Sequence, residues 1–356
     1  MSSVNAVRFL GTSTDDVAYG LTVYRNSFVS APRSGVFLYD NPMGVVSKKP
    51  ASGQKASQFL MGSDVPAPEE FTPGNELMGQ IWSMKEGTIT TDKYIVCHKW
   101  IPKDQMKWSH VDILPELAMK HKKRIEREMD RRIFILAVAA ARTAAVNEPS
   151  TQSGPGYNIH NGGNKVSRTG TSLSNVYAAS SGGATLFRTD LRRLAALMDE
   201  DNVSSKRLLW IAPAIREVLA FDSSATLWSK DYQNVNNLND RVLDKIDGFI
   251  PMGYPNYTSN DGPFPNEDII NTTNSKYTLQ ASVKTGDTTN GTPAALVLAV
   301  GDDGETAVGL DVYQEPENFV GYYPEKMSWL VMTSMLSGGG VMHPWCAGTI
   351  EAVSAS

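Results

Sequence analysis

The chain has 356 residues, of which 41% are hydrophobic and 20% are charged. That length and composition exclude a disordered chain and allow one large domain or two to three ordinary domains with real cores. The net charge of −5 and the isoelectric point near 5.6 argue against a protein that binds nucleic acid over a broad face, because neutralising phosphates needs a basic surface.

Residues 1–49 predict an arm that begins with a short helix. Thr14 or Asp15 can cap that helix, and apolar residues follow it at helical spacing, namely Val17, Leu21, Tyr24 and Phe28. The start of the chain lacks the basic and apolar regions of a secretory signal, and no stretch approaches the roughly 18 uncharged apolar residues of a membrane span. We therefore expect synthesis in the cytosol and no membrane partner.

Residues 50–92 predict a long two-stranded loop. The run ASGQKASQFLMG forms one side, a proline-rich tip DVPAPEEFTPGNE follows, and LMGQIWSMKEGTITTDK forms the return strand. Neither strand has a clean apolar face. Because an isolated two-stranded hairpin is marginal in water, we expect another surface to cover this loop.

A strand and a long helix are expected next. Residues 93–101, KYIVCHKWI, alternate as in a half-buried strand. From Leu114 onward apolar residues recur at steps of three and four, which predicts a helix over about 113–146 that is ~45 Å long at 1.5 Å per residue. Residues 147–183 are rich in glycine, serine and asparagine and predict a surface excursion.

The second half of the chain alternates between helical and extended patterns. The helical stretch ATLFRTDLRRLAALMDEDN precedes the strand RLLWIAP, which predicts a mixed sheet flanked by helices. Two apolar runs around Gly301–Gly304 predict a hairpin. The tail predicts one long strand, a bend at the glycine run SGGG (337–340) and a final strand.

The densest charge cluster is KHKKRIEREMDRR, residues 120–132, with seven Lys or Arg against three acids. Three interpretations are open. The cluster can be a DNA-binding helix, a solvated face whose ion pairs each contribute ~0.2–0.5 kcal/mol, or a surface that pairs with acidic residues of another subunit. The stretch 302–325 offers such an acidic surface, because it has seven acids and no Lys or Arg.

Candidate chemical sites are weak. The residue types of a zinc site occur at Cys97, His98, His343 and Cys346. Neighbours on a strand point to opposite faces, so Cys97 and His98 cannot both bind one metal without a bulge, and buried reduced thiols are expected. A nucleophile, a base and two carboxylates occur at Ser109, His110, Asp112 and Glu116. Without a GxSxG elbow, helix capping by Ser109 or Asp112 is the favoured interpretation. We expect no cofactor and no metal.

The order of these elements resembles the major capsid proteins of tailed bacteriophages with the HK97 fold, most closely those of T7-like podophages. SGQKASQFLMGSDVPAPEEFTPGNELMG is similar to the extended loop of that family, and GTITTDKYIVCHKWI to the strand that leaves it. The helix over 113–146 is similar to the spine helix. DEDNVSSKRLLWIAPAIREVLAF and LNDRVLDKIDGFIPMGYP resemble the axial domain, and MSWLVMTSMLSGGGVMHPWCAGTIEA the closing strands.

The resemblance implies an α+β chain with an HK97-like capsid fold. Its parts are an N-terminal arm (1–49), an extended loop (50–92), a peripheral domain with the spine helix (93–180), an axial domain with a central mixed sheet (181–311) and closing strands of the peripheral domain (312–356). The segments 147–183 and 253–278 look specific to this chain, and the resemblance does not place them on a shell.

The function that the resemblance implies is structural, not enzymatic. A major capsid protein assembles in the host cytoplasm into pentamers and hexamers of an icosahedral virion shell, with T=7 geometry in the T7-like relatives, around double-stranded DNA that it does not read. Its partners are further copies of itself, a portal protein, a separate scaffolding protein and a decoration protein. Two alternatives stay open, an encapsulin-like compartment of the same fold and a small-oligomer hydrolase that uses Asp112 and Glu116.

The arm and the loop are expected to reach neighbouring subunits, because ring symmetry uses heterologous contacts that close. Together they would bury ~1,500 Å² per subunit, the scale of a standard interface. Intersubunit contacts are predicted at Gln54, Lys55, Gln58, Phe59, Arg124, Arg127, Arg131, Arg132, Glu315 and Glu317.

Overall fold

A computed structural model of the chain describes residues 38–40, 42–50, 56–62, 70, 72–74, 84–92, 94–108, 113–147, 158–160, 162–170, 173–178, 182–212, 215, 218–219, 246–253, 277, 292–301 and 304–353. The predicted helix of the arm and most of the proline-rich tip lie outside these residues. So do five of the residues singled out above, namely Gln54, Lys55, Ser109, His110 and Asp112.

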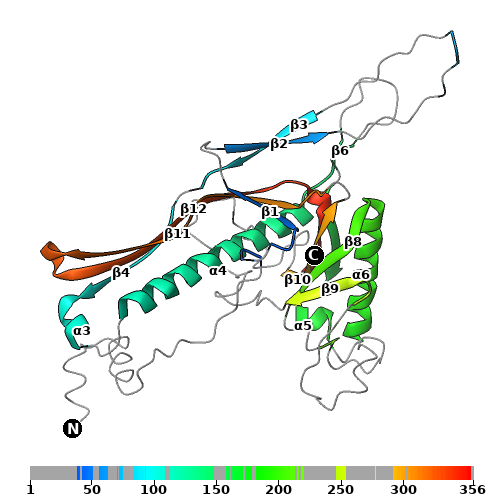
Figure 1. Cartoon of the computed structure of the whole chain (residues 1–356). Helices are drawn as coiled ribbons and strands as arrows, with labels where there is room; N and C mark the ends of the chain where they lie inside the picture. The colour runs from blue at the N-terminus through cyan, green and yellow to red at the C-terminus, as the bar shows by residue number, and fades with distance from the viewer. Residues whose placement is uncertain are drawn as a thin grey trace, which may run out of the picture.

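Two mixed sheets contain most of the described strands (Figure 1). The first sheet has four strands in the spatial order β1 (Val46–Pro50), β11 (Val308–Tyr323), β12 (Ser328–Val341) and β4 (Ile95–Pro102). The second has five in the order β7 (Asn164–Thr169), β13 (Ala347–Val353), β10 (Thr292–Gly301), β8 (Val203–Ile211) and β9 (Phe249–Gly253). Three neighbouring pairs are parallel, β1 with β11, β13 with β7 and β8 with β9, and the other pairs are antiparallel.

The remaining elements are helices and two narrow ribbons. The helices are α3 (Lys103–Trp108), α4 (Ile113–Ala141), α5 (Leu173–Val176) and α6 (Gly183–Glu200), with 3-10 turns η6 (Pro324–Lys326) and η7 (Pro344–Cys346). One ribbon pairs β2 (Ala56–Gly62) with β3 (Met84–Thr90), and the other pairs β5 (Val146–Asn147) with β6 (Asn158–His160). No helix in the described part of the chain is long and apolar enough to cross a membrane.

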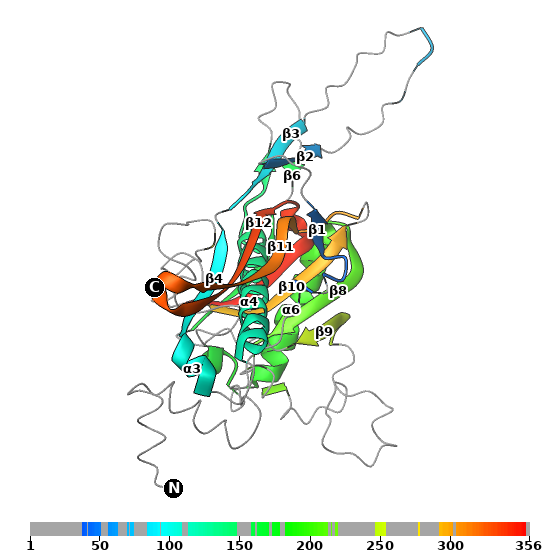
Figure 2. The same cartoon turned by 60° about the vertical axis from the view of Figure 1, so that its left-hand side comes forward.

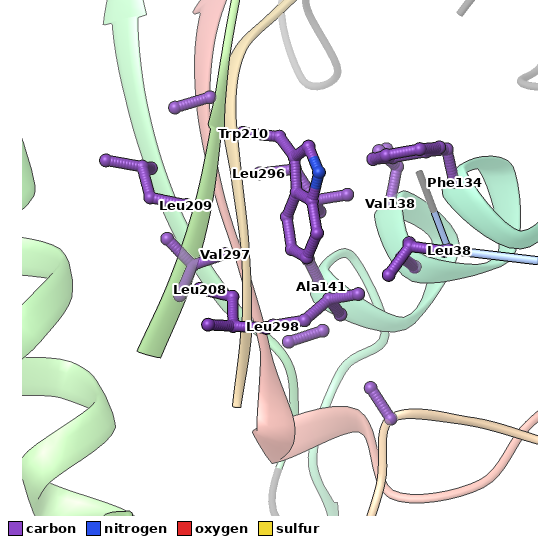
Figure 3. Close-up of a cluster of buried hydrophobic side chains, with 14 of the residues drawn as sticks. Leu38, Phe134, Val138, Ala141, Leu208, Leu209, Trp210, Leu296, Val297 and Leu298 are labelled. Atoms are coloured by element: carbon purple, nitrogen blue, oxygen red, sulfur yellow. The ribbon is translucent and has the colours of Figure 1, made fainter. Parts of the chain in front are cut away.

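The five-stranded sheet is covered on both faces. α4 lies against one face and α6 against the other (Figures 1 and 3). Strands that are buried on both faces have continuous apolar runs instead of alternation, and β10 fits this rule because Ala294 to Ala299 are all fully buried. On the α4 side, the rings of Phe134 and Trp210 meet edge to face with centroids 5.5 Å apart (Figure 3). This contact is the centre of the main core.

The spine helix α4 joins two packing regions. Near its start, Leu117 and Ala118 pack with Ile101 of β4 and Val331 of β12, in a small cluster under the four-stranded sheet. In its last two turns nearly every residue is buried, because the helix passes between the two sheets there. A single rigid helix therefore links the cores of both sheets.

The helix ends five residues before the predicted boundary at Val146. α4 stops at Ala141, and the amide of Thr143 donates to the carbonyl of Ala140 at 3.0 Å in a closing turn. Gly163 packs against this end, where a Cβ would lie 2.1 Å from the Ala140 oxygen. The chain that returns at Gly163 thus occupies the space into which the helix would continue, a tertiary contact that periodicity does not reveal.

The predicted hairpin around Gly301–Gly304 is wrong. The turn itself is tight, since the Gly304 amide donates to the Gly301 carbonyl at 3.1 Å and Gly304 has φ of 79°. However, β10 continues into the five-stranded sheet and β11 into the four-stranded sheet, and only one bridge, Val300 to Thr306, connects the two runs. The apolar pattern identified the strands and the turn, but the strands diverge because each is buried in a different sheet.

Candidate functional site

The ribbon β2–β3 stands away from both sheets (Figures 1 and 2). Phe59 on β2 is opposite Gly87 on β3, and a Cβ on Gly87 would lie 2.2 Å from the Phe59 ring. The ring therefore lies across the partner strand. It is half-buried and its centroid is 6.3 Å from that of His343, whereas Gln58 is exposed. Intersubunit contacts by Gln58 and Phe59 stay predictions, as do those by Gln54 and Lys55, which lie outside the described residues.

The base of the ribbon rests on the glycine run of β12. A Cβ on Gly338 would lie 2.4 Å from the carbonyl oxygen of Thr90, and one on Gly340 would lie 3.0 Å from Ile89. The Asp92 amide donates to the Ser337 carbonyl at 3.0 Å. The predicted bend at residues 337–340 is therefore wrong, since β12 passes through the run unbroken. The glycines leave room for the end of β3.

One buried carboxylate on the spine helix holds the described end of the arm. Asp130 is 3% exposed, and its Oδ1 accepts hydrogen bonds from the backbone amides of Leu38 at 2.6 Å and Tyr39 at 3.1 Å. The Leu38 side chain lies beside Val138 and Phe134 (Figure 3). The arm is thus fixed where α4 enters the main core.

A second contact joins the arm to β11. The Tyr39 hydroxyl donates to Glu315 Oε2 at 3.0 Å, and Lys48 Nζ lies 3.8 Å from Glu315 Oε1 and 4.0 Å from the centroid of the Tyr39 ring. Burial, together with the charge of Glu315, raises the pKa of Tyr39, so its hydroxyl stays a donor at neutral pH. Glu315 therefore has partners within its own subunit, although its side chain is two-thirds exposed.

The basic part of α4 divides into an exposed and a buried section. In the exposed section Lys122 pairs with Glu126 at 3.7 Å, as expected for a solvated face. In the buried section Arg131 lies 3.6 Å from Glu128, and the Arg132 guanidinium lies 3.7 Å from Glu128. Burial raises the pKa of Glu128, while the nearby arginines act in the opposite direction.

The four arginines predicted to bind a neighbour differ in exposure. Arg124 is exposed, Arg127 and Arg131 are half-buried, and Arg132 is buried with a further charge contact to Asp92 at 3.6 Å. The structure thus gives Arg131 and Arg132 partners inside the subunit. An intersubunit role for all four, and for exposed Glu317, stays a prediction.

The far end of the β11–β12 hairpin exposes large apolar side chains. Phe319 is 46% exposed and Met327 is 63% exposed, and Val320 and Tyr323 are also exposed. Figure 1 shows this end at the extremity of the molecule opposite α6. Tyr323 packs edge to face against Trp100 of β4, with ring centroids 5.2 Å apart. Exposed apolar side chains that gather at one place mark interaction surfaces.

The candidate chemical sites can be followed only in part, because Ser109, His110 and Asp112 lie outside the described residues. The described residues contain no group of three or more His, Cys, Asp or Glu that could hold a metal ion. Cys97 lies on β4, whereas Cys346 lies at the end of η7, where burial raises the pKa of its thiol to about 12. Glu116 pairs with Lys120 at 3.5 Å on the surface of α4.

Sequence reasoning missed Asp130 and Tyr39, the residues that fix the arm. Asp130 lies within the cluster of basic and acidic residues 120–132, whose composition does not distinguish it from the exposed charges. Its helical phase carried a signal, because Ile133 and Phe134, three and four positions later on the same face, are buried. Nothing comparable marks Tyr39, whose partner lies 276 residues away.

Comparison with known proteins gives the fold but no sequence family. No protein-family profile matches the chain, and no curated protein matches it. The capsid structure of cyanophage P-SCSP1u is similar with a TM-score of 0.69 at 18% identity, covering 92% of this chain and 91% of that one. The mature capsid of bacteriophage PhiM1 gives 0.61 at 13% identity, with 92% and 90% covered. A structure from Mycobacterium phage Che8 gives 0.56 at 10%, with 90% and 93% covered.

The chain therefore has the α+β fold of tailed-phage capsid proteins, the HK97-like fold. The resemblance predicted from the order of its elements is confirmed at the level of the fold. The narrower similarity to T7-like podophages stays a prediction.

Proposed function

We propose that the chain is the structural major capsid protein of a tailed bacteriophage. The observation that carries this proposal is the match to phage capsid structures over at least nine-tenths of both chains. A protein with this role is a component of the virion and has no catalytic task.

The proposal extends to assembly into pentamers and hexamers that enclose double-stranded DNA. Its support is the ribbon β2–β3 and the hairpin end at Phe319 and Met327, both of which project from the body (Figures 1 and 2). Projecting elements that a subunit does not cover are suited to heterologous contacts, which close into rings. In this proposal the ribbon and the arm cover neighbouring subunits, the ribbon through Gln54, Lys55, Gln58 and Phe59. The basic part of α4 and the strand β11 contact other subunits through Arg124, Arg127, Arg131, Arg132, Glu315 and Glu317.

The finer parts of the proposal concern domains and partners. We retain the arm, extended loop, peripheral and axial divisions as a working description, although β13 (Ala347–Val353) pairs with β10 across the proposed boundary at residue 311. A portal protein, a separate scaffolding protein, a decoration protein and T=7 geometry complete the proposal. Assembly takes place in the host cytoplasm.

Electron microscopy of the purified protein tests the assembly. We expect megadalton rings or closed shells, either from the protein alone or when a scaffolding protein is coexpressed. A uniform small oligomer under both conditions would contradict the proposal. Closed shells that form alone and retain a cellular protein cargo would instead support an encapsulin-like compartment.

A charge swap tests the predicted contact between α4 and β11 of different subunits. Arg124 and Glu317 are both exposed. We expect Arg124→Glu and Glu317→Lys each to lower the yield of shells, and the double variant to recover much of it, because exchanging the two charges restores the attraction. The readout is the fraction of protein in shells by sedimentation. Single variants that assemble at full yield would remove this contact from the proposal.

A further inference from the structure

Tyr277 is a buried tyrosine from the stretch of chain between β9 and β10. Tyr277 is 4% exposed. In the sequence it lies far from both the end of β9 at Gly253 and the start of β10 at Thr292. In the fold it packs at the base of the ribbon. None of the assembly surfaces described above includes it.

Tyr277 contacts three elements at once. Its hydroxyl donates to the Asp92 carboxylate, which follows β3, and accepts a hydrogen bond from the Gly339 amide of β12 at 3.3 Å. The guanidinium carbon of Arg132 on α4 lies 4.6 Å from the centroid of its ring. The ribbon base, the glycine run and the spine helix therefore meet at one side chain.

The tyrosine adds to the charge contacts at this junction. The side chains of Asp92 and Arg132 are both 6% exposed, and the 3.6 Å between Oδ2 and Nη1 is longer than a hydrogen bond. A buried ion pair is favourable only when further hydrogen bonds offset its desolvation. The Tyr277 hydroxyl supplies such a bond to Asp92, and its ring face supplies a cation–π contact to Arg132.

The strand beside the tyrosine leaves space for it. A Cβ on Gly339 would lie 2.7 Å from Leu136 of α4 and 3.3 Å from the Tyr277 hydroxyl. A larger residue at this position would displace one of them. Burial, reinforced by the charge of Asp92, raises the pKa of Tyr277, so its phenol remains protonated and able to donate at neutral pH.

We propose that Tyr277 is a positioning residue for the ribbon. Through its hydrogen bond to Asp92, the tyrosine holds the end of β3 against α4 and β12. Tyr277, the described residue between β9 and β10, is thereby hydrogen-bonded to the ribbon base. The inference concerns the folded subunit and does not rest on the proposed capsid function.

Hydrogen exchange of the full chain tests the inference. Tyr277→Phe keeps the ring and removes only the hydroxyl. We expect amides in residues 84–92 to exchange about tenfold faster or more, since a hydrogen bond to a charged group is lost, with no change in β8 or β10. The matched control is Tyr322→Phe, because Tyr322 is half-buried and its ring packs in a tilted arrangement against Trp329 at the hairpin end, with centroids 5.3 Å apart. Unchanged exchange at 84–92 in Tyr277→Phe would overturn the inference.

A second variant separates positioning from general destabilisation. If Tyr277 acts through Asp92, then Tyr277→Phe adds little to the exchange of residues 84–92 in an Asp92→Ala background, where the side chain of residue 92 has no oxygen to accept the hydroxyl. Additive effects, or faster exchange throughout β8 and β10, would show that the tyrosine only stabilises the whole fold. Both measurements are made on unassembled protein, so a failure to form shells would leave their outcome intact.

Discussion

At the scale of residues, buried charged side chains hold distant segments together. Glu351 on β13 is fully buried, and it lies 2.6 Å from Arg142, just beyond α4, and 3.8 Å from Lys165 on β7. Asp130 is similarly enclosed and accepts two amides of the arm. Breaking a buried pair leaves a charge without compensation, so each of these residues is sensitive to replacement.

Replacing Asp130 tests how the arm is attached. Asp130→Ala leaves the amides of Leu38 and Tyr39 without this acceptor, and we expect a loss of about 1.5–3 kcal/mol in the free energy of unfolding. Asp130→Asn keeps an acceptor oxygen and should lose less. Urea denaturation measures both variants against Asp104→Ala, an exposed acid on α3. Equal stability of Asp130→Ala and the control would show that the arm does not depend on this carboxylate.

Residue roles were the part least predictable from sequence. The basic run of α4 was correctly identified as charged, but the pattern does not separate Arg124, which is exposed, from Arg132, which is buried. Besides Glu128 on the same helix, Arg132 contacts Asp92, which lies in a different predicted element. A residue's burial follows from helical phase only when the surface that packs on the helix is known.

At the scale of elements, the strands and the long helix were predictable and their partners were not. The pattern of KYIVCHKWI predicted β4, and the apolar stripe predicted α4 to within a few residues. The glycine run and the Gly301–Gly304 turn were given wrong roles. In both places the local sequence indicates where glycine is required, but contacts with distant segments determine the path of the chain. At the glycine run the contact is with the end of β3, and at the Gly301–Gly304 turn the two strands enter different sheets.

Gly338→Ala tests the contact between β12 and the ribbon base. The added methyl would lie 2.4 Å from the Thr90 carbonyl oxygen, so either β12 or the end of β3 must move. We expect a loss of about 1–3 kcal/mol in stability, as for other overpacked sites, with faster hydrogen exchange at residues 84–92. Ser334→Ala in the same strand is the control. A Gly338→Ala variant as stable as wild type would show that the ribbon base is free to shift.

At the scale of the whole molecule, the subunit presents projections at separate places. The ribbon stands above the body, and the hairpin end with its exposed apolar side chains lies at the extremity opposite α6 (Figures 1 and 2). α4 connects the cores from which these parts extend. The order of the elements predicted the ribbon, as an extended loop, through the resemblance, whereas nothing in the sequence analysis predicted that the hairpin end projects.

Polar substitutions at the hairpin end test whether it binds other copies. Phe319→Ser and Met327→Ser change exposed side chains, so we expect the stability of the unassembled subunit to stay within about 0.5 kcal/mol of wild type. Under the proposed function, the yield of shells should fall. Thermal unfolding serves as the control for folding, and sedimentation measures assembly. Normal shell yield from the double variant would exclude the hairpin end as an essential contact.

The position of β13 has a consequence for how the subunit folds. β13 follows all its partners in the chain, yet it is an inner strand of its sheet, with β7 on one side and β10 on the other. Its pairing with β7 joins Gly348 to Asn164, and long separations of this kind slow folding. The sheet therefore cannot close until the ribosome has synthesised β13. Nascent subunits are thereby kept from completing this sheet, and from associating as folded units, before β13 has been synthesised.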